Sequence, residues 1–160
     1  MEHRVVKEIV SYYQAVPAMV RLLKAERREL EDEYNGLQGM NMDGMPHGTT
    51  PGKPVESMVE TLDENHTADR LKVVAVKIQI LEMDADAIKG CLDALNGRYK
   101  TLILLRYSRG YSWAHISLEM GVPDSTVRNW HDRAMERLGE VLEDVPMVDE
   151  LAGRASRART

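Results

Sequence analysis

Two long stretches of the chain repeat apolar residues at alternating steps of three and four. The first stretch covers about residues 2–34, and its apolar positions are Val6, Ile9, Tyr13, Val16, Val20, Leu23, Leu30 and Tyr34. The second covers about residues 55–95, with Leu71, Val74, Ile78, Leu81, Ala85, Ile88, Leu92 and Leu95. This spacing places apolar side chains along one side of a helix, so each stretch predicts a long helix with a coiled-coil-like seam. Antiparallel pairing within one chain is the simplest arrangement, and pairing between two chains is the alternative.

Two features interrupt these helices. Pro17 lies inside the first pattern, where it removes a backbone donor and is expected to kink or break the helix. Residues 35–54 are rich in Gly and Pro, which predicts a loop at the tip of the hairpin. Residues 1–96 therefore form a predicted helical arm. We interpret this arm as an assembly surface, through which the protein forms a homo-oligomer.

Residues 97–142 have the pattern of a helix-turn-helix domain. A short helix is predicted from Arg98 to Tyr107, and a second, capped by Ser112, from Trp113 to Met120. The turn is Gly121-Val122-Pro123, in which glycine allows a left-handed backbone. The last helix runs from Thr126 to about Leu142, with Asp124 or Ser125 as its cap. The predicted fold is all-α, a helical hairpin followed by this domain.

The predicted reading face lies on the last of these helices. Its inward stripe is Val127, Trp130, Ala134 and Leu138, which leaves Ser125, Thr126, Arg128, Asn129, Asp132 and Arg133 outward. Arg and Asn form bidentate contacts with guanine and adenine, so Arg128 and Asn129 are the predicted base-reading residues. The predicted phosphate or sugar contacts are Ser125, Thr126 and Arg133. Trp113 either reaches the DNA backbone through its indole N–H or packs over the helix junction.

Charge and composition narrow the class of protein. The net charge is -5, yet residues 97–142 carry 7 Lys and Arg against 5 Asp and Glu, which makes this block net positive. One cysteine, no long apolar run and no signal-peptide pattern favour a soluble protein of the cytoplasm, without a membrane segment. The histidines show no metal-ligand spacing, and we find no catalytic motif, so neither an enzyme nor a cofactor is expected. Residues 143–160 read as a disordered tail.

Three segments of this region resemble a known family: Leu104-Leu-Arg-Tyr107, Gly110-Tyr-Ser-Trp-Ala-His-Ile116 and the run from Ser125 to Leu138. They resemble the DNA-binding region four of sigma-70-like factors, and more closely the bacteriophage late transcriptional regulators of the ArpU and RinA type. The resemblance implies a phage or prophage protein of a bacterial host cell. Such a protein binds double-stranded promoter DNA, activates packaging or lysis genes and contacts host RNA polymerase.

Two other functions fit the same sequence. A small terminase subunit, which packages phage DNA, also joins a helix-turn-helix to oligomerising helices. A polymerase-binding adaptor would use the same module to bind protein instead of DNA. A sequence-specific transcriptional regulator is the leading hypothesis, because the positive block of the chain coincides with the helix-turn-helix pattern.

Overall fold

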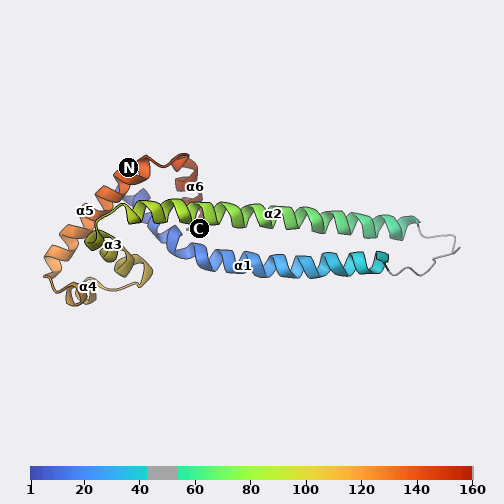
Figure 1. Ribbon diagram of the computed structural model, residues 1–160, viewed down its shortest axis with the longest axis horizontal. Coiled ribbons are helices and arrows are strands. Elements are labelled where there is room, and N and C mark those ends of the chain that lie inside the picture. The colour runs from blue at the N-terminus through green and yellow to red at the C-terminus, as the bar shows by residue number, and fades with distance from the viewer. Residues whose placement is uncertain (43–53, 160) are drawn as a thin grey trace. The chain divides into compact units, whose positions relative to one another are not determined.

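The computed structural model describes residues 1–42 and 54–159, and the side chains outside residues 38–63 (Figure 1). Every element in these ranges is helical. The elements are α1 (His3–Met42), α2 (Pro54–Asp93), α3 (Gly97–Ile103), the π-helical turn η1 (Leu104–Ser108), α4 (Trp113–Met120), α5 (Asp124–Glu143) and α6 (Val148–Ala158). The predicted all-α fold, a long helical hairpin followed by a helix-turn-helix, is confirmed.

Residues 18–81 form one compact unit, in which the later part of α1 and the earlier part of α2 lie side by side and antiparallel (Figure 1). Its buried apolar side chains belong to the predicted seams: Val20, Leu30, Val74, Ile78 and Leu81. An ion pair between Arg70 and Glu26, 4.0 Å apart, joins the two helices. The two seams therefore pack within one chain, as the simpler of the two arrangements requires.

Residues 1–17 and the chain from residue 82 onward form the second compact unit. The first turns of α1 and the end of α2 thus share a unit with the helix-turn-helix. Ile9 of α1, Ile88 of α2 and Leu138 of α5 are fully buried there. The boundary between compact units consequently falls inside α2, and not at residue 96 as predicted.

The C-terminal segment is a helix, so the prediction of a disordered tail over residues 143–160 is wrong. Leu151 and Ala155, one turn apart on α6, are both 2% exposed. Arg154 donates two hydrogen bonds of 2.7 Å to Asp84, and the hydroxyl of Tyr12 donates a third of 2.7 Å to the same carboxylate. The segment folds because Arg154 finds a buried carboxylate, a partner that the local sequence does not show.

Two expectations about the hairpin also change. Of the kink or break expected at Pro17, the break does not occur, because α1 continues through that residue, and the boundary between the compact units follows it. Residues 35–42, predicted as loop, extend α1, while residues 43–53 of that predicted loop lie outside the described residues. Pro54 begins α2, where a missing backbone N–H breaks no intrahelical bond.

Candidate nucleic-acid interface

The turn between α4 and α5 has the predicted geometry. Gly121 ends α4 with a φ of 67°, the left-handed conformation that glycine adopts without a steric penalty. Its N–H donates to the carbonyl of Ser117. The Ser117 hydroxyl donates a hydrogen bond to the carbonyl of Val122, so a side chain of α4 also holds the turn in place. A residue without a hydroxyl at position 117 would lose this bond.

The two helices of the motif begin in different ways. Ser112 caps α4 as predicted, because its hydroxyl accepts a hydrogen bond of 3.1 Å from the backbone N–H of His115. α5 begins at Asp124 after Pro123, and no side chain among the described residues caps it. The predicted cap by Asp124 or Ser125 is therefore wrong. Asp124 lies in the first turn, where its carboxylate still interacts favourably with the helix dipole.

A small core holds α3, α4 and α5 together. Leu102, Ile116 and Val127, one from each helix, are completely buried. The side chains that pack around them are Leu105, Tyr111, Trp113, Met120, Val122 and Trp130. Burial of Val127, Ala134 and Leu138, with Trp130 half-buried, confirms the predicted inward stripe of α5. The opposite side of α5 is therefore turned to solvent.

The predicted reading residues lie where a recognition helix would present them. Ser125, Arg128, Asn129 and Arg133 are exposed, whereas Thr126 is half-buried. Because Ser125, Arg128 and Asn129 are spaced by one turn, they share a face near the N-terminus of α5. Asp132 is exposed on the same face. The Arg128 Nε lies 3.5 Å from Asp124, an exposed pair that solvent screens and that DNA phosphates or bases can displace.

Trp113 packs mainly against protein. The guanidinium of Arg106 lies 4.3 Å from the centre of its ring, and that of Arg128 lies 5.8 Å away. The ring also meets His131 edge-on, with 4.9 Å between the ring centres. Of the two roles considered for Trp113, packing over the helix junction fits these contacts better. Trp113 then helps to position Arg128, one of the predicted base-reading residues.

His131 has surroundings that its sequence neighbours do not reveal. It is buried, and its Nε2 lies 2.9 Å from the hydroxyl of Tyr107 in η1. Burial lowers the pKa of His131 below its usual value and raises the pKa of Tyr107, so both groups are neutral near pH 7. Their contact ties η1 to α5 behind the reading face.

Two further arginines near the interface were missed. Arg98 stacks over Trp130 at 4.3 Å, which places a cation of α3 beside α5. Arg137 follows Arg133 by one turn, and both line a groove that also holds Glu136 and Glu140, the second of which pairs with Arg137 at 2.7 Å. The spacing of Arg133 and Arg137 was a usable sequence signal, because positions four apart on a helix share a face. The stacking of Arg98 on Trp130 depends on the fold and left no such signal.

Comparison with known families identifies the motif. Residues 85–138 match the family model of sigma-70, region 4. This family is a DNA-binding helix-turn-helix domain, so that part of the chain is similar to a DNA-binding, sigma-like domain. The match begins within α2, 12 residues before Gly97, so the end of α2 belongs to the domain. Neither the curated proteins nor the solved structures gave a significant match.

None of the described helices has the length and apolar content needed to cross a bilayer.

Proposed function

We propose that this protein is a sequence-specific DNA-binding regulator of transcription. The observation that carries the proposal is the exposed N-terminal face of α5, where Arg128 and Asn129 project from a helix whose other side is locked into the core. A recognition helix of a helix-turn-helix places these positions at base edges in the major groove. The match to sigma-70 region 4 over residues 85–138 supports the same use of α5.

The contacts proposed on DNA fall into two classes. Arg128 and Asn129 read bases, because their planar donor groups make paired hydrogen bonds with guanine and adenine. Ser125, Thr126 and Arg133 contact phosphates or sugars, which sets the orientation of α5 without selecting a sequence. Because Thr126 is half-buried, we expect it to contribute less to these phosphate or sugar contacts than Ser125 and Arg133.

Binding by one copy is expected to be modest, so we infer that the protein acts as a homo-oligomer. Residues 97–142 have a net charge of only +2, and Asp132 lies on the reading face, where it repels phosphates. A second copy doubles the number of DNA contacts without strengthening any of them. The hairpin of residues 18–81 carries exposed apolar side chains that support an assembly role, namely Leu22, Val73 and Val76.

The biological setting we propose is a phage or prophage in the cytoplasm of a bacterial host. The support is the resemblance of residues 104–138 to late regulators of the ArpU and RinA type, which activate packaging or lysis genes. A sigma-like domain on DNA is also well placed to contact host RNA polymerase. Mass measurement in solution separates the two phage roles: a monomer or dimer fits a regulator, whereas a ring of eight or more copies would indicate a small terminase.

Selection of binding sites from random duplex DNA, followed by fluorescence anisotropy, tests the proposed function. The full chain should select one sequence and bind it with an affinity that falls as salt rises. Arg128→Ala should weaken binding to that sequence by about 1–3 kcal/mol and relax the preference at one base pair. Arg28→Ala, which removes an exposed arginine of the hairpin, is the matched control and should change little. Absence of sequence preference in the folded protein would refute the proposal, and equal weakening on all sequences would make Arg128 a phosphate contact.

A further inference from the structure

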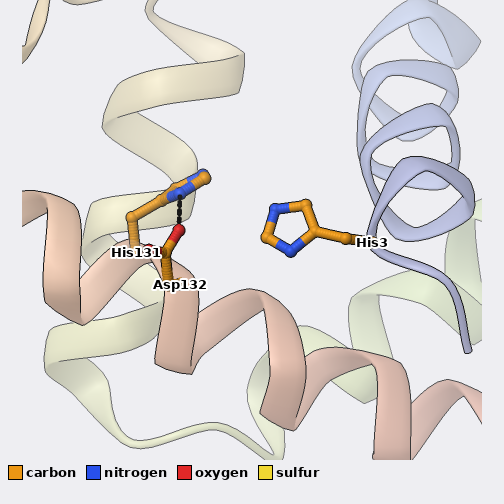
Figure 2. Close-up of side chains that lie close together, drawn as sticks. All are labelled: His3, His131 and Asp132. Carbon is orange, nitrogen blue, oxygen red and sulfur yellow. Dashed lines mark ion pairs between the residues drawn. The ribbon is translucent and has the colours of Figure 1, made fainter.

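Three side chains, one from the start of α1 and two from α5, lie close to one another. His3 is the first residue of α1, and His131 and Asp132 are neighbours on α5, all within the same compact unit. One ligand atom from each residue lies within 4.8 Å of the other two. Figure 2 shows the His3 ring directed from α1 toward His131, with the Asp132 carboxylate below the His131 ring. The histidine spacing in the sequence gave no sign of this cluster.

We propose that His3, His131 and Asp132 bind a divalent transition-metal ion of the Zn²⁺ type. Two imidazole nitrogens and one carboxylate oxygen are a donor set that Zn²⁺ accepts, and water completes the fourth position in sites of this kind. The ion would link the first turn of α1 to α5. It would therefore fasten the N-terminal segment to the helix that carries the reading face.

The geometry requires only small side-chain movements. Zn²⁺ binds nitrogen and oxygen at about 2.0–2.2 Å, so two ligands in a tetrahedral site are about 3.5 Å apart. The observed separations of up to 4.8 Å must shorten by about 1.3 Å at most. His3 and Asp132 are exposed and free to rotate toward the fixed, buried His131. His3 and His131, but not Asp132, line a cavity of about 410 Å³, which has room for an ion and its water beside the two histidines.

The surroundings of His131 suit a metal ligand. A histidine that binds metal through one nitrogen usually donates a hydrogen bond from the other, which fixes the ring. The Tyr107 hydroxyl can accept that bond from Nε2, and Nδ1 then presents its lone pair on the side of Asp132, whose Oδ1 is 3.6 Å away. Arg106 and Lys7 line the cavity beside His3 and His131 and their positive charges oppose a cation, whereas Asp132 supplies the negative charge of the proposed ligand set.

The chain contains a matched control for the cluster. His115 and Glu119 on α4 are an exposed histidine and carboxylate 3.6 Å apart, one turn from each other. They supply one imidazole and one carboxylate, whereas the proposed site supplies a second imidazole from α1. Zn²⁺ binding that depends on three residues is therefore distinguishable from weak binding to any histidine–carboxylate pair.

Calorimetric titration of the full, untagged chain with Zn²⁺ tests the proposal. The expected result is one equivalent bound, with affinity at least tenfold weaker in His3→Ala and in Asp132→Ala and unchanged in His115→Ala. Both ligand variants replace exposed side chains, and circular dichroism verifies that they fold. In the unaltered protein, the imidazole NMR signals of His3 and His131 should shift with Zn²⁺ while those of His115 stay. Absence of Zn²⁺ binding, unaltered affinity in either ligand variant, or equal loss in His115→Ala would overturn the proposal.

Discussion

The two compact units of this chain are both built from helices, but they bury their side chains to different depths. In the unit that carries the helix-turn-helix, Leu102, Ile116 and Val127 from three different helices are completely buried. In the hairpin of residues 18–81, two helices share one seam, and an apolar residue such as Leu22 stays 73% exposed. A site that must hold recognition residues in fixed positions needs the first kind of core. A two-helix arm leaves apolar surface exposed that a partner can cover.

The largest difference between the units should appear on truncation of their cores. Ile116→Ala removes a fully buried side chain enclosed by α3, α4 and α5, and we expect a loss of about 4 kcal/mol in the free energy of unfolding. Leu30→Ala in the hairpin, where solvent can fill the space, should cost about 2 kcal/mol. Urea denaturation followed by circular dichroism measures both. Equal losses would mean that the hairpin packs as deeply as the DNA-binding unit.

The buried polar network of the first unit should be next in effect. The Asp84 side chain is 6% exposed and accepts hydrogen bonds from Tyr12 and Arg154. Asp84→Ala leaves both donors without their acceptor, and we expect a loss of about 3 kcal/mol. Glu26→Ala, which breaks the exposed ion pair with Arg70 in the hairpin, is the control and should cost less than about 1 kcal/mol. A small effect of Asp84→Ala would show that α6 is held by Leu151 and Ala155 alone.

The sequence predicted the parts of this structure that depend on local rules. The 3-4 spacing from Leu71 to Leu95 located α2 because helix periodicity is a property of adjacent turns. The Gly121 turn and the Ser112 cap were found because each residue type has a specific backbone role there. The inward position predicted for Val127 then indicated which side of α5 faces solvent.

The parts that were missed depend on contacts between distant segments. α6 is short and rich in Ala and Arg, and it is held by Asp84, 70 residues before Arg154. The same limit applies to His3 and His131, which no spacing rule relates. The cap of α5 was misassigned for a more local reason: Pro123 fixes the backbone just before α5, so the helix starts one residue earlier than a cap at Asp124 would place it and two residues earlier than a cap at Ser125 would.

The smallest expected effect concerns helix capping within the unit that carries the helix-turn-helix. Ser112→Ala removes the acceptor for the His115 N–H, and we expect a loss of about 1 kcal/mol, because α4 has only eight residues and a single side-chain cap. Ser125→Ala is the matched control: Ser125 is exposed in the first turn of α5 and caps no helix, so stability should change by less than about 0.5 kcal/mol. DNA affinity should respond in a different way. Ser125→Ala removes a proposed phosphate contact, so it should weaken DNA binding while the free energy of unfolding stays unchanged. If Ser125→Ala lowered the stability of the protein together with its DNA affinity, the residues that hold the fold and those that contact DNA would not be separate.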